Sequence, residues 1–200
     1  MLCMQACTCM KDTSQRILDA AILVFGRDGV TGATTREIAR VAKVNEVTLF
    51  RYFKNKNELL RQVVVQSCKR YEQVFADASV KTPADLRRTV RAYAETAAEK
   101  LRDNEDLVRT FMGELKRHLK LLRRLFVEAA KPGKQKFIDY LHAAQKAGLV
   151  RKDLDVVIAA DALTGMLLAG ILRRPLTESA YSYPKYVETC VELFLKGIER

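Results

Sequence analysis

The segment 34–53 constrains the fold more than any other part of the chain, because it has the pattern of two short helices joined by a tight turn. Thr34 and Glu37 have the S/T-x-x-E spacing of a capping box, in which the hydroxyl meets an unpaired N–H of the first turn and the glutamate returns the bond. The turn falls at residues 43–45, and Asn45 is suited to cap the second helix. Helices this short bury their apolar sides only against a further helix, so the segment predicts a compact helical unit.

The two short helices have a buried and an exposed side. An apolar set at helical spacing is expected to pack against a preceding helix: Ile38, Ala42, Val44, Leu49 and Phe53. The other side of the second helix is mixed polar and aromatic: Glu46, Val47, Thr48, Phe50, Arg51 and Tyr52. Such a surface is unsuited to a core and is typical of a recognition helix, whose hydroxyl, amide and apolar groups contact base edges in the major groove of DNA.

Further contacts with DNA are predicted at helix starts, where free N–H groups and the helix dipole favour a phosphate. Thr35 and Arg36 lie in the first turn of the first short helix. Asn55 and Glu58 repeat the capping pattern, so a third helix is predicted to start at Lys56, with its positive end and a lysine available to the DNA backbone. The predicted DNA-contacting residues are Thr35, Arg36, Asn45, Glu46, Val47, Thr48, Phe50, Arg51, Tyr52 and Lys56.

In this region the sequence resembles the TetR family of one-component transcriptional repressors. The resemblance covers residues 13–60 and rests on matches in order and spacing at Phe25, Gly29, residues 34–39, Val44, residues 48–50, residues 52–56 and residues 58–60. It implies an all-α fold, in which an N-terminal three-helix helix-turn-helix DNA-binding domain precedes a C-terminal helical ligand-binding and dimerisation domain. It further implies a homodimer that binds a palindromic double-stranded DNA operator, represses transcription, and is released by a small, mostly hydrophobic inducer.

Three positions depart from the family pattern. Lys43 stands where the family usually has glycine, in a left-handed turn position that costs a side chain roughly 1 kcal/mol or more. Val47 replaces a common glycine or proline. Glu46 places a negative charge near the expected phosphates, where it either accepts a bond from a cytosine amino group or weakens binding. The operator sequence therefore does not follow from the resemblance.

The chain carries 35 basic and 24 acidic side chains, a net charge of +11, which suits a polyanionic partner. Residues 11–57 hold nine Lys or Arg and five Asp or Glu, a net of +4, whereas residues 114–136 hold eight and two, a net of +6. The second run is amphipathic, with an apolar stripe formed by Leu115, Leu119, Leu122 and Phe126. We interpret it as a core-facing helix with a solvated basic back. The alternatives are binding to a membrane surface, and attraction of an acidic ligand by Arg117, Arg123 or Arg124.

Helical periodicity continues along the rest of the chain, and no strand-length β-branched run or hairpin signal is present. Helices are predicted over 12–28, ended by Gly29, then over 56–79, over 82–102, from Asn104 to a break at 131–133, from there to 147–148, over 153–172 and over 184–199. The helix from Lys56 is expected to connect two domains mechanically. The predicted organisation is a disordered leader at 1–10, the helix-turn-helix domain at 11–55 and the ligand-binding and dimerisation domain at 56–200.

The last two predicted helices are the most apolar, and the first of them is rich in small residues that permit close approach of backbones. Two-fold repressors that resemble this chain pair such helices in a four-helix bundle, so we expect them to form the dimer interface. The predicted interface residues are Ala159, Ala162, Leu163, Met166, Ala169, Gly170, Val187, Val191 and Phe194. The alternative is that these helices form only the core of the second domain.

A ligand pocket is predicted among bulky apolar groups of the middle helices: Tyr71, Phe75, Tyr93, Phe111, Met112, Phe137, Tyr140 and Met166. Tyrosines would donate hydrogen bonds to a mostly apolar ligand, and ordinary core packing is the alternative for each residue. The sequence has no cofactor or metal signature and no catalytic motif such as G-x-S-x-G or H-E-x-x-H. We therefore expect no cofactor and no enzymatic activity.

Five cysteines are present, and Cys3, Cys7 and Cys9 lie close together near the start. An alternative function is a DNA-binding regulator that senses thiol oxidation or a metal through these three residues, although a nearby second pair of zinc ligands is lacking. A simpler interpretation is that translation starts at Met10 and that residues 1–9 are a disordered or wrongly assigned leader. Cys68 and Cys190 are expected to be small buried hydrophobes.

No run reaches the roughly 18 uninterrupted apolar residues of a membrane span, and the start has neither a signal-peptide nor a transit-peptide pattern. We therefore expect no membrane partner and a location in the bacterial cytoplasm. The remaining alternative, of a different class, is a helical adaptor that has lost DNA binding and uses its basic amphipathic helix to bind a partner or a membrane.

Overall fold

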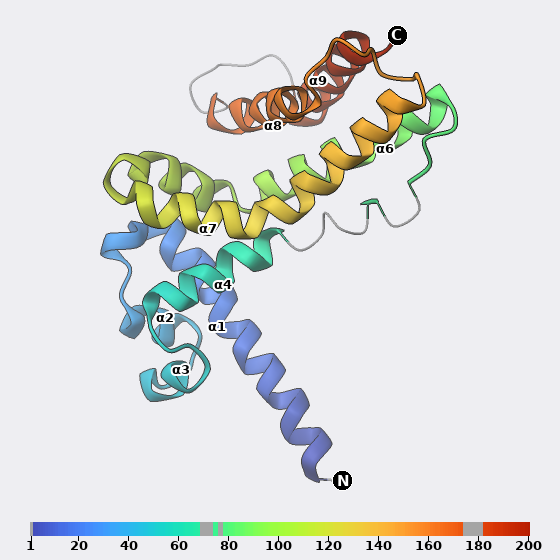
Figure 1. Cartoon of the computed structure of the whole chain (residues 1–200). Coiled ribbons are helices and arrows are strands. Elements are labelled where there is room, and N and C mark those ends of the chain that lie inside the picture. The colour runs from blue at the N-terminus through green and yellow to red at the C-terminus, as the bar shows by residue number, and fades with distance from the viewer. Residues whose placement is uncertain (1, 69–73, 76–77, 174–181) are drawn as a thin grey trace. The chain divides into compact units, whose positions relative to one another are not determined.

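A computed structural model describes residues 2–68, 74–75, 78–173 and 182–200 of the chain. Figure 1 shows the α-helices whose bounds lie within these residues: α1 (Leu2–Gly32), α2 (Thr35–Val41), α3 (Glu46–Tyr52), α4 (Lys56–Cys68), α6 (Pro83–Asp103), α7 (Glu105–Lys146), α8 (Val156–Arg173) and α9 (Tyr183–Ile198). In this described part of the chain, β pairing is limited to an isolated bridge between Val150 and Glu199. The predicted all-α fold, with a helix-turn-helix near its start, is confirmed.

The chain divides into two compact units. The first comprises residues 1–67 and 104–127, and the second comprises residues 68–103 and 128–200. The domain boundary that we predicted between residues 55 and 56 does not coincide with this division, because α4 packs an apolar side that includes the fully buried Leu59 and Leu60 and belongs to the first unit. Helix α7 contributes its first half to the first unit and its second half to the second.

Helix α1 bends sharply at Gly29, whose backbone has φ 76° and ψ 176°. This region of φ and ψ is open essentially to glycine alone, so the predicted end of the first helix corresponds to the bend. Ahead of the bend, α1 buries Ile17 and Phe25 completely, as the packing partner of α2 must. The backbone is helical from Leu2, so residues 2–10, for which we predicted a disordered leader, are part of α1 here.

The helix predicted from Lys56 does not extend to Ser79. The described part of helix α4 runs from Lys56 to Cys68, and Phe75 and residues 78–80 are not helical. Ser79 instead bonds to α7 and to the start of α6: its carbonyl oxygen accepts from the Tyr140 hydroxyl of α7 at 2.9 Å, and its hydroxyl donates to Asp85 of α6 at 3.2 Å. Hydrogen bonds to distant residues thus outweigh the local helical pattern at the end of this segment.

The predicted break at residues 131–133 is also wrong, because α7 continues through Pro132 to Lys146. Phe137 and Leu141, which follow the proline, are completely buried in the second unit, so packing stabilises the helix despite the missing N–H of Pro132. The predicted end of this helix is confirmed: Gly148 has φ 78°, and the Leu149 N–H donates back to the carbonyl of Ala144 at 2.9 Å.

The basic run in α7 has the exposed back that we predicted. Its described cationic side chains, Lys116, Lys120, Arg123 and Arg124, are all exposed. The side chains of Leu115, Arg117, Leu119, Leu122 and Phe126 lie outside the described residues.

The core of the second unit is formed by α6, the second half of α7, α8 and α9. Helices α8 and α9 lie side by side in Figure 1, and both contact α6. Helix α8 is long and apolar enough to cross a membrane by length and composition alone. However, seven of its residues are buried inside the unit, and its Asp161 forms an ion pair with Lys134, so its apolar character serves packing.

Candidate nucleic-acid interface

The starts of α2, α3 and α4 are capped as the sequence predicts. Thr34 Oγ1 accepts from the Glu37 N–H at 3.1 Å. Asn45 Oδ1 accepts from the Val47 N–H at 2.9 Å, and Asn55 Oδ1 accepts from the Glu58 N–H at 2.9 Å. Each cap satisfies one of the free N–H groups of a first turn, and each is local in sequence. The three helix starts that were predicted to face DNA therefore exist.

Glu37 does not use its carboxylate for the reciprocal bond of the capping box. Its two oxygens accept from Arg40 at 2.7 and 2.8 Å, and one also accepts from Arg27 at 3.0 Å. The guanidinium groups of Arg40 and Arg27 lower the pKa of the Glu37 carboxyl from 4.5 to about 2. The negative charge of Glu37 is therefore engaged in ion pairs with arginines of α1 and α2.

The turn between α2 and α3 has the left-handed residue that the sequence predicts. Lys43 has φ 55°, and it is the only non-glycine residue of the described chain with a positive φ. Arg16 of α1 donates to the carbonyl oxygens of Ala42 at 2.7 Å and Lys43 at 3.3 Å. A cation at the end of α2 also complements the helix dipole. Sequence reasoning missed Arg16, because nothing local relates it to a turn 26 residues away.

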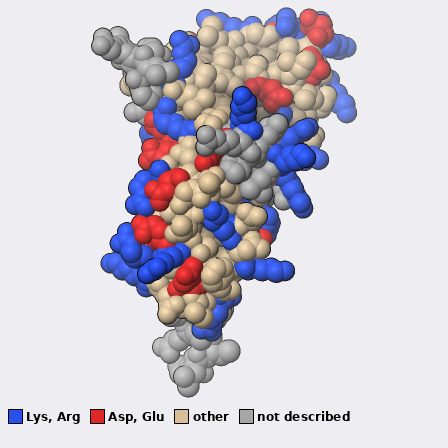
Figure 2. Space-filling view, turned by 90° about the vertical axis from the view of Figure 1, so that its left-hand side faces the viewer, with Lys and Arg blue, Asp and Glu red and all other residues tan. Residues whose placement is uncertain are grey.

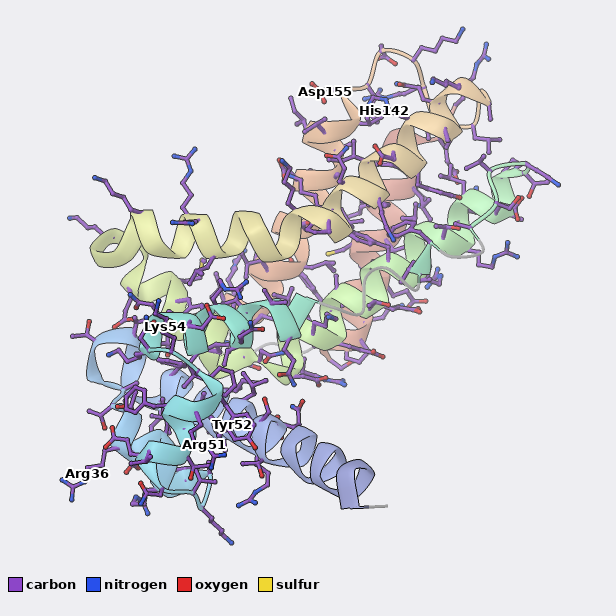
Figure 3. The ribbon with its side chains drawn as sticks, turned by 60° about the horizontal axis from the view of Figure 1, so that its bottom comes forward. Arg36, Arg51, Tyr52, Lys54, His142 and Asp155 are labelled. Atoms are coloured by element: carbon purple, nitrogen blue, oxygen red, sulfur yellow. The ribbon has the colours of Figure 1, made fainter. Side chains whose placement is uncertain are left out.

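The outer side of α3 carries two exposed apolar side chains. Val47 and Phe50 are 69% and 47% exposed, whereas Leu49 between them is completely buried. Arg51 is also exposed, and Thr48 and Tyr52 are half-buried. Exposed apolar groups grouped on one short helix are typical of a binding surface. Figure 3 shows Arg51 and Tyr52 on this helix.

Glu46 is held by Thr35. The Thr35 hydroxyl donates to Glu46 Oε1 at 2.6 Å and thereby joins the first turns of α2 and α3. The negative charge that departs from the family pattern is thus engaged within the protein. The bond also occupies the Thr35 hydroxyl proton, which we predicted to contact a phosphate.

Lys56 is placed differently from our expectation. Its ammonium group donates to the carbonyl oxygens of Val30 at 2.8 Å and Ala33 at 2.9 Å, and so fixes the end of α1. Two other cations are exposed near the outer surface of the helix-turn-helix: Arg36, which points away from α2 in Figure 3, and Lys54, which follows α3. Lys54 was absent from the predicted contacts, although the residues 54–56 were part of the resemblance.

Positive and negative side chains are interspersed on one face of the molecule. In the face drawn in Figure 2, Lys and Arg side chains alternate with Asp and Glu side chains. Glu58 accepts from Arg61 at 2.8 Å and from Gln62 at 3.0 Å, and these bonds lower the pKa of its carboxyl from 4.5 to about 2. Part of the positive charge of the first unit is therefore engaged by carboxylates of the same unit.

The predicted ligand-pocket residues fall into separate groups. Phe75, Tyr93, Phe137 and Tyr140 form one aromatic cluster in the second unit, and the rings of Tyr93 and Phe137 stack with centroids 4.0 Å apart. Phe111 and Met112 belong to the first unit, Met166 packs at the edge of the second core, and Tyr71 lies outside the described residues. Tyr93, Phe137 and Tyr140 are buried in the core of the second unit, and Phe75 packs against them.

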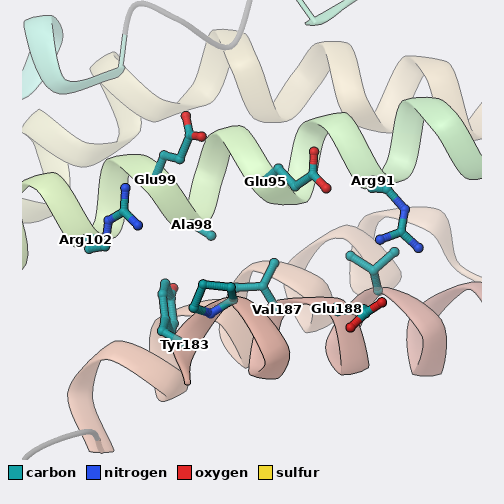
Figure 4. A pocket seen from close by; sticks show the side chains of 10 residues that line it. Arg91, Glu95, Ala98, Glu99, Arg102, Tyr183, Val187 and Glu188 are labelled. Carbon is teal, nitrogen blue, oxygen red and sulfur yellow. The ribbon is translucent and has the colours of Figure 1, made fainter. Parts of the chain in front are cut away.

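A surface groove in the second unit lies between α6 and α9. Figure 4 shows its charged rim and apolar floor, formed by Arg91, Glu95, Ala98, Glu99, Arg102, Tyr183, Pro184, Val187, Glu188 and Val191. None of the predicted pocket residues lines it. The groove therefore differs in chemistry from the apolar pocket that the sequence predicted.

The predicted dimer-interface residues lie mostly inside the protomer. Five of them belong to the core of the second unit: Ala159, Leu163, Val187, Val191 and Phe194. Gly170 is also buried. Ala162 is exposed, and Met166 and Ala169 are half-buried. The exposed apolar surface of α8 and α9 is instead centred on Ile158 and Leu193, which are 67% and 60% exposed. Sequence periodicity identified the apolar helices, but not which of their sides packs internally.

Cys190 is buried, as expected of a small apolar group, and this burial raises the pKa of its thiol. The side chains of Cys3, Cys7, Cys9 and Cys68 lie outside the described residues. Among the residues that are described, no group of three His, Cys, Asp or Glu side chains is arranged to hold a metal ion.

Comparison with known proteins follows the two parts of the sequence. Residues 17–63 match the family model for bacterial regulatory proteins of the tetR family, and residues 82–189 match the tetracyclin repressor-like C-terminal domain. YvkB of Bacillus subtilis, an uncharacterized HTH-type transcriptional regulator, is 28% identical over 192 residues, which are 94% of this chain and 98% of that protein.

Two solved structures of regulators share the fold, and the first is described as a fatty acid degradation regulator. FadR from Bacillus halodurans superimposes with a TM-score of 0.75 at 22% identity, over 94% of this chain and 97% of that one. FadR from Bacillus subtilis, solved in complex with stearoyl-CoA, gives a TM-score of 0.74 at 21% identity, over 92% and 99% of the two chains.

Proposed function

Because the chain belongs to the TetR family of bacterial transcriptional regulators, we propose that it is a ligand-responsive repressor that binds a palindromic DNA operator as a homodimer. The observation that carries this proposal is the outer surface of α3, where Val47, Phe50 and Arg51 are exposed on a helix fixed by the Asn45 cap and the buried Leu49. Such a short, rigid helix fits the major groove. We expect the protein to act in the bacterial cytoplasm.

DNA contact is divided between two kinds of side chain. Val47 and Phe50 are suited to thymine methyl groups, and Thr48 and Tyr52 to hydrogen bonds with base edges or the backbone. Arg36 and Lys54 are suited to phosphates, which position the protein without specifying sequence. We assign to Lys54 the phosphate contact predicted for Lys56, because the Lys56 ammonium is engaged by main-chain oxygens.

A palindromic operator requires a two-fold protein, with recognition helices one or two turns of DNA apart. The exposed apolar residues Val157 and Ile158 of α8 and Leu193 of α9 support pairing of two protomers through these helices. Alongside Ile158, the exposed positions Ala162 and Gly165 continue the same side of α8 with small residues that permit close packing.

The inducer is proposed to be mostly apolar and to insert at the aromatic cluster of Phe75, Tyr93, Phe137 and Tyr140. Apolar aromatic walls with a few hydroxyl groups favour such a ligand. The stearoyl-CoA bound to FadR of Bacillus subtilis gives long-chain acyl compounds a place among the first candidates to test. A ligand that binds one conformation better than the other shifts the population, and operator DNA must weaken its binding by the same factor.

The proposal is tested by selecting duplexes from a randomised library with the purified protein, then measuring affinity at several salt concentrations. Thr48→Ala and Tyr52→Ala should reduce the ratio of the affinity for the selected duplex to the affinity for random DNA. Lys54→Ala should weaken both kinds of binding and flatten the salt slope by about one unit. A protein that enriches no sequence, or three variants with the same loss of specificity, would contradict the proposal.

A further inference from the structure

One side of α7 is seated against the end of α1 through residues spaced four apart: Asp106, Thr110 and Glu114. All of these residues belong to the first unit. At Gly26 the two helices approach closely, because a Cβ atom there would lie 3.2 Å from the Asp106 Cβ. Residues four apart share one side of a helix, so α7 presents a single row of short and polar groups to α1.

Two main-chain groups at the bend of α1 are bound by this row. In an unbroken α-helix, the Val30 N–H would donate to the carbonyl oxygen of Gly26. Here the Val30 N–H donates to Glu114 Oε2 at 2.7 Å, and the Gly26 carbonyl accepts from the Thr110 hydroxyl at 2.6 Å. Because main-chain polar groups away from water require partners, α7 stabilises the bend at Gly29 by supplying both.

The Glu114 carboxylate also occupies the space beside Gly29, where a Cβ atom would lie 2.6 Å from Oε1. From α4, the Lys56 ammonium binds the carbonyl oxygens of Val30 and Ala33. The last turn of α1 is therefore held between a carboxylate of α7 and an ammonium of α4. Since α2 begins at Thr35, this turn sets the direction in which α2 and α3 leave α1.

We propose that Glu114 is a positioning residue for DNA recognition: by accepting the Val30 N–H, it fixes the bend of α1 and thereby the placement of α2 and α3. The inference rests on the proposed function. It identifies Glu114 as a residue through which α7, which belongs to both units, contacts the helix that leads into the helix-turn-helix. Helix α7 continues into the core of the second unit, so a shift of α7 that moves Glu114 also moves the recognition helix.

The test compares Glu114→Ala and Glu114→Gln with Glu99→Ala, which removes an exposed glutamate of α6 and controls for net charge. Loss of a negative charge alone should strengthen binding to DNA. Glu114→Ala should instead weaken binding to the library-selected duplex by about tenfold, with random-duplex binding unchanged or stronger. Glu114→Gln keeps an acceptor for the Val30 N–H and should remain within about threefold of the wild type.

Amide hydrogen exchange of Val30 in the full chain gives a second measurement that does not require DNA. Exchange at this amide should accelerate in Glu114→Ala and remain slow in Glu114→Gln and Glu99→Ala. If Glu114→Ala and Glu99→Ala bind the selected duplex equally tightly, or if amide exchange at Val30 is unchanged in Glu114→Ala, the positioning role of Glu114 is wrong. Neither result would contradict the proposed function. A wild-type protein that selects no DNA sequence would overturn the proposed function itself.

Discussion

At the scale of single residues, Val47 and Phe50 make a prediction about the operator. They are the exposed apolar side chains of α3, three positions apart on one side. Replacing a contacted thymine by deoxyuridine removes only a methyl group, and should weaken wild-type binding by about fourfold. Val47→Ala should bind less tightly and lose most of this sensitivity. Thymines outside the protected site serve as the control. If the wild type and Val47→Ala lose the same affinity on replacement by deoxyuridine, Val47 does not contact the thymine methyl group.

A second prediction at this scale concerns the contribution of Gly29 to the stability of the fold. Gly29→Ala should lower the free energy of unfolding by about 1–3 kcal/mol, because its backbone conformation is strained for any side chain and the new methyl group would meet the Glu114 carboxylate. Urea denaturation measures the change. Gly113→Ala, where nothing lies within 4 Å of the new Cβ, is the control and should be neutral or stabilising. Similar losses in both variants would refute the explanation.

At the scale of helices, the start of α4 predicts a dependence of stability on pH. Bonds from Arg61 and Gln62 lower the folded-state pKa of Glu58 from 4.5 to about 2. A carboxyl group with a lowered pKa stabilises the fold above its unfolded value and loses that contribution as pH falls through the folded value. The urea midpoint should therefore fall between pH 4.5 and about pH 2, and it should fall less in Glu58→Gln. If the urea midpoints of the wild type and Glu58→Gln depend on pH in the same way, the bonds of Glu58 are excluded as a cause.

Helix starts were predictable because capping is local: Thr34, Asn45 and Asn55 each bind an N–H two or three residues later. Helix lengths were less predictable. The pattern from Lys56 favoured a helix that reaches Ser79, where the chain is not helical, and Pro132 favoured an end that α7 does not have. In both cases burial or hydrogen bonding in the second unit outweighed the local preference, which contributes little per residue.

At the scale of the whole molecule, the exposed apolar sides of α8 and α9 predict the assembly. Ile158→Asp should shift the protein from dimer to monomer in sedimentation experiments and weaken operator binding at least tenfold, because a buried unpaired carboxylate is costly and one recognition helix alone contacts half of a palindrome. Ala84→Asp adds the same charge at an exposed position in the first turn of α6, and should leave both properties unchanged. A dimeric Ile158→Asp variant would place the interface elsewhere.

The sequence by itself determined the all-α class of the fold, the three capped helix starts and the left-handed turn at Lys43. The caps and the turn depend on residues within about one helical turn of each other, so a local pattern records them directly. The tertiary structure decided how Glu46 and Lys56 are engaged, which side of α8 and α9 remains exposed, and where the first unit ends. These features depend on contacts between distant segments, such as Glu114 with Val30 across 84 residues, and no local periodicity encodes the partner of a side chain that far away.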